Sequence, residues 1–478
     1  MLWLVVSAVV LVSVQILLLR GLGVLKWESE RESESSSRRF RVSVLMGLAA
    51  TSIYVLAVVK FITPEAGQQR SEIERTAASQ RVAVDKRINN LVALANHRNA
   101  LPRGRTAEEI DFAMRALQEA RSAAAAGRIV EANDRLEWAD GLIQQGRPYV
   151  VEVLYGTDRR ATPQVPLHVR YGSERGNLET GVCSVSIPPW PQHKEGEVES
   201  PSRLWNVLHL RRSFESPYRH VVLLSTDVLT DVDFVDELRA RLERRQPESR
   251  TIFLFVHGYN MSFEDACKRT AQLWFDLRYL GVPVMYSWPS NGSTVAYPHD
   301  AEEPGYSAEN LVSFIKLLSS CNRVRSMDLL AHSMGGGVFS RAAAALSTSG
   351  CPIDELVLAA PDVDADVFAR DILPVLGRLA KRTTLYASSN DKALGLSEGL
   401  WRHHRLGEAG EWLFVRHGID TIDASLVDTD FLGHSYYGDG SAVTDDLAEL
   451  VNHHTSPSSR RRLVPMQSSS GRFYVFSP

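Results

Sequence analysis

The stretch that decides the fold is residues 329–336, Leu-Leu-Ala-His-Ser-Met-Gly-Gly. An apolar, strand-like run ends abruptly at Ser333, and small residues then lead into a helical run at 338–346. This pattern is typical of a nucleophile elbow, a strand–turn–helix that holds a serine hydroxyl on a tight, strained turn above a sheet. Gly335 lets the backbone pass close to the serine, where a β-carbon would clash. Because Ala331 replaces the first glycine of the usual G-x-S-x-G pattern, the surrounding sequence has to support the assignment.

The sequence around the elbow alternates between strands and helices. Residues 251–256 form a continuous apolar, β-prone run, as expected of a strand that is buried on both faces. Helical stretches then follow at 264–280 and 308–320, and strand-like stretches at 282–287, 356–360 and 383–388. This alternation predicts an α/β fold with a mostly parallel, doubly wound sheet.

A catalytic acid and a histidine are expected after the serine, in that order. Asp391 follows the second strand after the elbow strand and is the preferred acid, whereas Asp362 follows the first of those strands and is the rival. His434 lies in a glycine-rich loop beyond the last strand-like run, at 412–415, and His417 is its rival nearer that run. The imidazole would take the proton of the serine hydroxyl, and the carboxylate would fix the tautomer of the imidazole.

Seven stretches resemble a known family of proteins. They are 155–159 Tyr-Gly-Thr-Asp-Arg, 255–260 Phe-Val-His-Gly-Tyr-Asn, 286–290 Tyr-Ser-Trp-Pro-Ser, 331–336 Ala-His-Ser-Met-Gly-Gly, 360–364 Ala-Pro-Asp-Val-Asp, 387–394 Ala-Ser-Ser-Asn-Asp-Lys-Ala-Leu and 433–437 Gly-His-Ser-Tyr-Tyr. Over 151–451 the chain resembles a bacterial family of α/β-hydrolases of unknown function in the esterase/lipase superfamily. The resemblance implies the α/β-hydrolase fold and a Ser/Asp/His hydrolase, but no substrate. Asp362 belongs to the shared pattern and therefore stays open as the acid.

The oxyanion hole of such a hydrolase is made of two backbone N–H groups, one after the nucleophile and one in the loop that follows an earlier strand. We assign these donors to Met334 and Tyr259, with Asn260 as an alternative for the second. His257, Asn260 and Trp288 are candidates for the pocket lining, although a structural role suits His257 and Trp288 at least as well.

The N-terminal part of the chain predicts a membrane anchor. Residues 2–19 and 42–63 are apolar stretches near the length of about 20 residues that a transmembrane helix needs. No basic residue precedes the first stretch and no cleavage site follows it, so it is expected to remain uncleaved. Six basic residues lie between the stretches, whereas only three occur from Lys60, near the end of the second stretch, to Arg75. This bias predicts a multi-pass protein of the bacterial inner membrane with its catalytic domain on the periplasmic side.

Four regions are expected along the chain: two transmembrane helices at 1–63, a helical stalk and α-hairpin at 64–148, the catalytic domain at 149–454 and a mobile Ser/Arg-rich tail at 455–478. The hairpin would consist of helices at 106–126 and 129–145 and could serve self-association. Within the catalytic domain, 172–217 is rich in Pro, Gly and Ser and is expected to be a long, partly exposed excursion.

Composition narrows the classes of partner. The chain has 478 residues, is 44% hydrophobic and carries 53 Lys and Arg against 57 Asp and Glu, a net charge of −4. This near balance argues against a nucleic-acid partner, and the sequence suggests neither a metal nor a cofactor. The sequence therefore predicts a membrane-anchored serine hydrolase that cleaves a small-molecule or lipid ester through an acyl-serine. Acyl transfer to another acceptor, or a non-catalytic membrane scaffold that keeps the fold, are the alternatives.

Overall fold

The computed structural model describes most of the chain beyond residue 79. The described residues are 80–89, 107–144, 148–162, 170–190, 192–201, 215–291, 300, 302–389, 403–427 and 440–477. No helix within this part of the chain is long and apolar enough to cross a membrane. The two expected membrane spans, at 2–19 and 42–63, lie outside the described residues, so the anchor stays a prediction.

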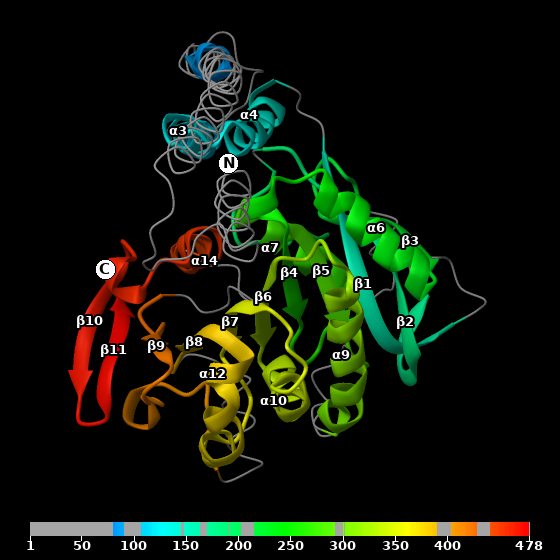
Figure 1. Ribbon diagram of the computed structural model, residues 1–478, viewed down its shortest axis with the longest axis vertical. Coiled ribbons are helices and arrows are strands. Elements are labelled where there is room, and N and C mark those ends of the chain that lie inside the picture. The colour runs from blue at the N-terminus through cyan, green and yellow to red at the C-terminus, as the bar shows by residue number, and fades with distance from the viewer. Residues whose placement is uncertain are drawn as a thin grey trace, which may run out of the picture. The chain divides into compact units, whose positions relative to one another are not determined.

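A single eleven-stranded sheet forms the centre of the described part of the chain, in the order β10-β11-β9-β8-β7-β6-β4-β5-β1-β2-β3 (Figure 1). Its parallel part consists of β1 (Tyr149–Ala161), β4 (Thr251–Val256), β5 (Val282–Ser287), β6 (Ser326–His332), β7 (Ile353–Ala359), β8 (Ala380–Ala387) and β9 (Asp420–Asp423). The antiparallel strands β2 (Tyr171–Ile187) and β3 (Val222–Leu229) extend one end. At the other end, β11 (Gly471–Phe476) pairs parallel to β9 and antiparallel to β10 (Leu463–Ser468). The predicted mostly parallel α/β sheet is confirmed.

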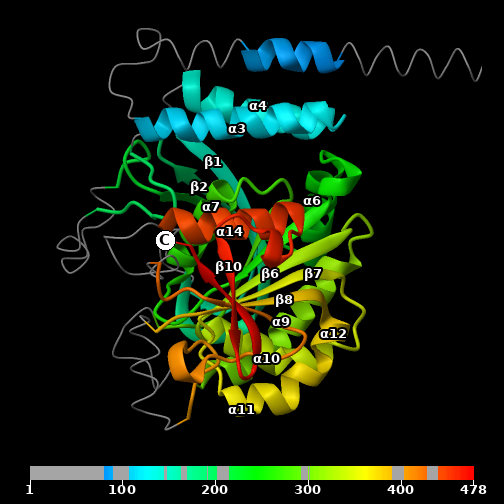
Figure 2. The same ribbon diagram turned by 90° about the vertical axis from the view of Figure 1, so that its left-hand side faces the viewer.

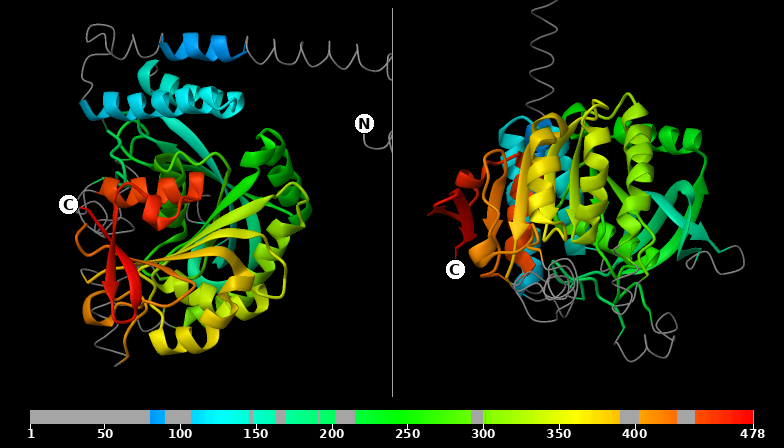
Figure 3. Two further views of the ribbon diagram at one scale, coloured as in Figure 1. Left: turned by 60° about the vertical axis from the view of Figure 1, so that its left-hand side comes forward. Right: turned by 90° about the horizontal axis from the view of Figure 1, so that it is seen from below.

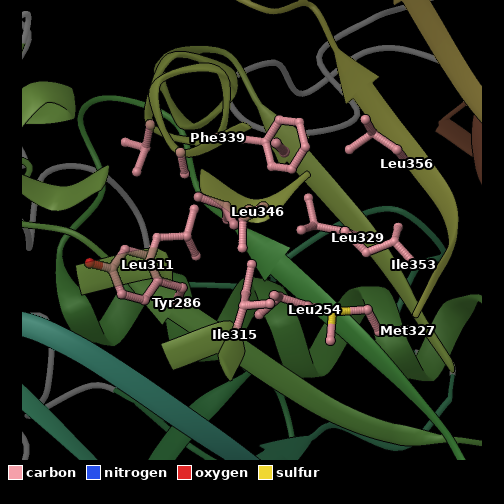
Figure 4. Close-up of a cluster of buried hydrophobic side chains, with 14 of the residues drawn as sticks. Leu254, Tyr286, Leu311, Ile315, Met327, Leu329, Phe339, Leu346, Ile353 and Leu356 are labelled. Carbon is pink, nitrogen blue, oxygen red and sulfur yellow. The ribbon is translucent and has the colours of Figure 1, made fainter. Parts of the chain in front are cut away.

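Helices cover both faces of this sheet. Alternate side chains of a strand point to opposite faces, so Leu254 and Val256 of β4 join one core while Phe253 and Phe255 join the other. The first core packs under α6 (Asp231–Glu243), α9 (Glu303–Ser320), α10 (Met334–Leu346) and α12 (Leu376–Leu379), and Figure 4 shows its part between α9, α10 and the strands. The second core packs under α7 (Phe263–Asp276) and α14 (Gly440–His453). The sheet is therefore doubly wound, as predicted.

Short helical turns complete the catalytic domain. They are η3 (Pro247–Ser249), α11 (Ala365–Val367), the π-turn η5 (Phe368–Ile372), η6 (Leu373–Val375), η7 (Gly410–Trp412) and η9 (Pro457–Ser459). Three of them, α11, η5 and η6, follow one another without a break and lead into α12, so most of the connection from β7 to β8 is helical.

Three sequence expectations were wrong at the margins of the sheet. The excursion expected at 172–217 begins as β2, a long strand of which much of the first half is partly exposed, so its side chains lack a simple apolar pattern. The tail expected to be mobile forms β10 and β11, which Figure 3 shows at the end of the sheet opposite β2. No strand forms at 412–415: the exposed Trp412 ends η7, and the buried Phe414 and Val415 belong to the irregular chain that follows.

The N-terminal helices form a small bundle with its own core. Helix 80–89 packs against α3 (Ala107–Ala125) and α4 (Ile129–Gln144), the two helices predicted for the α-hairpin (Figure 2). Polar contacts join this bundle to the catalytic domain. Arg135 donates a hydrogen bond of 2.5 Å to the carbonyl oxygen of Arg278, and Glu119 lies 3.4 Å from the Arg135 guanidinium and 3.5 Å from that of Arg278.

Candidate active site

The loop between β6 and α10 has the geometry of a nucleophile elbow. Ser333 has φ 49° and ψ −121°, a backbone conformation that costs free energy for any residue other than glycine. Three backbone hydrogen bonds hold it there: the Ser333 N–H donates to the carbonyl oxygen of Ala359 at 2.9 Å, and the carbonyl oxygen of Ser333 accepts from the N–H groups of Gly336 at 2.9 Å and Asp362 at 3.1 Å. Ser333 directly follows the last residue of β6 and so stands at the carboxyl edge of the sheet. The residue is 5% exposed, which gives it limited access to solvent.

Two glycines allow the chain to pack closely around this serine. A β-carbon on Gly335 would meet the carbonyl oxygen of Val256 at 2.5 Å and that of His257 still closer. A β-carbon on Gly258 would lie 3.0 Å from the β-carbon of Ser333 and 2.7 Å from Nδ1 of His332. The loop after β4 therefore runs directly against the elbow, as the sequence motifs predicted.

The predicted oxyanion donors flank this contact. Tyr259 follows Gly258 in the same loop, and Met334 is the first residue of α10, where backbone N–H groups have no partner within the helix. Asn260, the alternative donor, has φ 58° and marks a sharp turn of the loop. Burial, helped by the nearby Asp300 carboxylate, raises the pKa of the Tyr259 hydroxyl, so this side chain stays neutral beside the site.

The two candidate acids differ in their placement. Asp362 lies next to the elbow, but its Oδ1 is 3.1 Å from the guanidinium of Arg405, with which it forms a largely buried ion pair. Asp391 falls outside the described residues. The preceding strand, β8, reaches the elbow edge of the sheet, since the Ala360 N–H donates to the carbonyl oxygen of Tyr386.

The positions of the two candidate histidines differ more clearly than those of the acids. His417 is exposed and precedes β9, so it lies at the amino end of a parallel strand, whereas Ser333 lies at the carboxyl edge. The structure thus does not bring His417 to the elbow. His434 falls outside the described residues. It follows β9, which ends at the elbow edge, where the Ala424 N–H donates to the carbonyl oxygen of Ala387 at 2.8 Å.

His257 and Trp288, the pocket candidates, are instead fully buried, so neither lines a pocket open to solvent. Their rings stack with centroids 5.1 Å apart, and the Trp288 Nε1–H donates to the carbonyl oxygen of His257 at 2.6 Å. Burial, with the charge of Arg159 nearby, lowers the pKa of His257 to about 3, which keeps its imidazole neutral. Both side chains therefore support the loop that faces Ser333.

Arg159, in β1, is a residue of this region to which the sequence reasoning gave no role. Its guanidinium is buried and donates to the Ser287 hydroxyl at 2.9 Å and, in three further bonds, to the backbone carbonyl oxygens of Gly172 (3.0 Å), Met261 (2.7 Å) and Ser290 (2.9 Å). Burial lowers its pKa to about 10, so it remains charged at neutral pH. The sequence does contain a signal for this residue, because Arg159 ends the stretch 155–159, one of the seven that resemble the family.

The comparisons with known proteins agree with this geometry. A family described as "Alpha/beta hydrolase of unknown function (DUF900)" has a model that matches residues 233–453, from α6 to α14. No curated protein and no solved structure gives a significant match. The chain is thus similar to an α/β-hydrolase family over its elbow and the surrounding parallel sheet. The family similarity supports hydrolase activity and indicates no substrate. Among the described residues, no three His, Cys, Asp or Glu side chains are grouped as a metal ion would require.

Proposed function

We propose that this protein is a membrane-anchored serine hydrolase that cleaves carboxylic esters of small molecules or lipids. The observation that supports the proposal most directly is the strained backbone of Ser333 between β6 and α10, with Gly258 and Gly335 packed against the elbow. Strain of about 1–3 kcal/mol at one residue persists only where the surrounding structure maintains it, and such sites cluster where function needs them.

The chemistry follows from the residue types. The hydroxyl oxygen of Ser333 attacks the ester carbonyl carbon while His434 accepts its proton, and the Tyr259 and Met334 N–H groups stabilise the resulting oxyanion. The C–O bond then breaks, the alcohol leaves with the proton from His434, and water releases the acid from the acyl-serine. We assign the histidine's partner to Asp391, because one carboxylate oxygen of Asp362 is already paired with Arg405.

The anchor and the orientation belong to the same proposal. The apolar stretches 2–19 and 42–63 would hold the protein in the bacterial inner membrane, and the basic residues between them favour a periplasmic catalytic domain. An alkaline phosphatase fused after Thr63 should then be active. An inactive phosphatase, together with an active cytoplasmic reporter at the same position, would reverse the orientation. Crosslinking of the intact membranes tests whether the helical stalk also joins two copies.

Labelling by an alkyl fluorophosphonate tests the hydrolase itself. The full-length wild type should be labelled at Ser333, and Ser333→Ala should not be. Substitution of Asp391 or His434 by alanine should slow labelling without loss of folding, whereas His417→Ala, at an exposed turn on the opposite edge, is the matched control and should label normally. Equal labelling of wild type and Ser333→Ala would refute the proposed nucleophile.

The same measurements separate the alternatives. A folded wild type that is not labelled would favour a scaffold that keeps the fold without the activity. If the protein is labelled yet esters are consumed faster in the presence of an added alcohol or amine, acyl transfer is the reaction. A panel of esters with different acyl lengths would then identify the substrate class.

A further inference from the structure

A chain of hydrogen bonds leads from Arg159 to the loop that faces Ser333. The Arg159 Nε–H donates to the Ser287 hydroxyl oxygen at 2.9 Å, and that oxygen lies 3.1 Å from Nε2 of His257. Nδ1 of the same ring lies 2.7 Å from the carbonyl oxygen of Gly258. The elements involved are β1, the end of β5 and the loop after β4, which come together only in the folded sheet.

The two ends of this chain, a guanidinium and a carbonyl oxygen, determine the direction of every hydrogen bond in it. A guanidinium can only donate, so the Ser287 oxygen accepts from Arg159 and its hydroxyl hydrogen is free to be given to His257. A carbonyl oxygen can only accept, so the proton of the neutral imidazole is on Nδ1, facing Gly258, and Nε2 accepts. A second guanidinium nitrogen of Arg159, at 3.4 Å from Nε2, favours the same tautomer.

This arrangement fixes one peptide plane. The carbonyl group of Gly258 and the N–H of Tyr259 belong to the same peptide unit, and in a trans peptide they point in opposite directions. The carbonyl is held toward the buried ring of His257, so the N–H points away from that ring. Gly258 itself lies against Ser333, with its hypothetical β-carbon 3.0 Å from that of the serine.

We infer that Arg159 is a positioning residue for the oxyanion hole: through Ser287 and His257 it orients the Gly258–Tyr259 peptide so that the Tyr259 N–H faces the oxyanion formed at Ser333. The inference rests on the proposed serine hydrolase and adds a function for a residue that lies outside the family match, which begins at residue 233. Arg159 also donates to the carbonyl oxygens of Met261 and Ser290, and these bonds hold the loop after β4 and the loop after β5.

The test uses the full-length protein and an alkyl fluorophosphonate, whose phosphoryl oxygen occupies the oxyanion hole as Ser333 displaces fluoride. Labelling as a function of probe concentration separates the binding constant of the probe from the maximal rate. Arg159→Gln and Arg159→Lys should lower the maximal rate by roughly 10- to 100-fold, since loss of a whole oxyanion donor costs about 10²–10³. The binding constant should change little, because the uncharged probe is bound before the hole is filled.

Substitutions of His257 keep the inference testable if Arg159 variants fold poorly. An asparagine amide can replace Nδ1–H and donate to the Gly258 carbonyl, whereas a glutamine amide reaches only toward the Nε2 side. His257→Asn should therefore retain a maximal rate at least several-fold above that of His257→Gln. Because Arg159 acts through His257, the double variant of Arg159→Gln and His257→Gln should be no slower than the slower single variant.

Arg135→Lys is the matched control. It replaces another buried arginine that donates to a backbone carbonyl, in α4, and should lower the stability of the protein without changing the labelling rate. Normal maximal rates in folded Arg159 variants, or equal rates for the two His257 variants, would overturn the inference while the hydrolase proposal stands. An unlabelled wild type would instead refute the hydrolase proposal, and the inference with it.

Discussion

Replacing Gly335 by alanine would place a β-carbon 2.5 Å from the carbonyl oxygen of Val256 and closer still to that of His257. Ordinary contact begins near 3.4 Å, so the end of β4 and the elbow must separate by roughly 1 Å. Both neighbours are backbone atoms in the centre of the sheet and have no alternative rotamer. We expect the variant to lose about 1–3 kcal/mol of unfolding free energy, the usual cost of overpacking.

The effect on the reaction should be larger than the effect on stability. A displacement of about 1 Å moves the loop that carries the Tyr259 N–H relative to Ser333, and misplacement of this size can cost on the order of 10²-fold in rate. The measurements are urea unfolding of the full-length chain, followed by tryptophan fluorescence, and the rate of fluorophosphonate labelling.

Gly337→Ala is the control for this substitution. Gly337 lies in the same helix, but its hypothetical β-carbon meets nothing closer than 3.7 Å. Alanine should therefore stabilise the helix by about 0.5–1 kcal/mol and leave labelling unchanged. If Gly335→Ala matches Gly337→Ala in both stability and labelling rate, the close approach of β4 to the elbow does not constrain the site and the reasoning fails.

Three further predictions concern stability and docking. Trp288→Phe leaves the buried carbonyl of His257 without this donor and should cost about 1–3 kcal/mol in urea unfolding; a change under about 0.5 kcal/mol would contradict the role of that bond. Burial raises the pKa of Asp328 from 3.8 to about 7, so the folded state retains a proton that the unfolded state loses, and stability should fall as pH rises from about 4 to 7. Asp328→Asn should flatten that part of a plot of melting temperature against pH, and an unchanged slope would assign it to other groups. Glu119→Gln weakens the ion pair between Glu119 and Arg278, which links the α-hairpin to the catalytic domain, so residues 107–144 should take up deuterium faster while labelling stays normal; unchanged uptake would show that this pair does not hold the hairpin.

The parts of the fold that the sequence predicted are those whose signals are local. A buried parallel strand is a continuous apolar run, and an elbow is a strand, a serine, glycines and a helix in direct succession, so β4, β6 and α10 could be identified from sequence. Strand β2 could not, because much of its first half is partly exposed and shows neither a continuous apolar run nor a regular alternation.

The supporting side chains of the site could not be assigned from sequence for a different reason. The partners of Arg159 are mostly the carbonyl oxygens of Gly172, Met261 and Ser290, which lie far apart in sequence, and a bond to a carbonyl oxygen does not depend on residue type. A tryptophan directly after a strand suits a pocket wall and a buried core equally, and the stacking of the Trp288 ring on His257 becomes apparent only in the folded structure.

The position of β11 has a consequence for the synthesis of the protein. This strand lies between β9 and β10, so β9 remains an open sheet edge until the ribosome has added residues 471–476. Unpaired edges invite pairing with other chains, and partly made polypeptides would therefore be prone to aggregate. A chain that stalls or terminates just before residue 471 would already contain the elbow residues, but its sheet would still be open at β9. Such products would be natural substrates for chaperones and proteases.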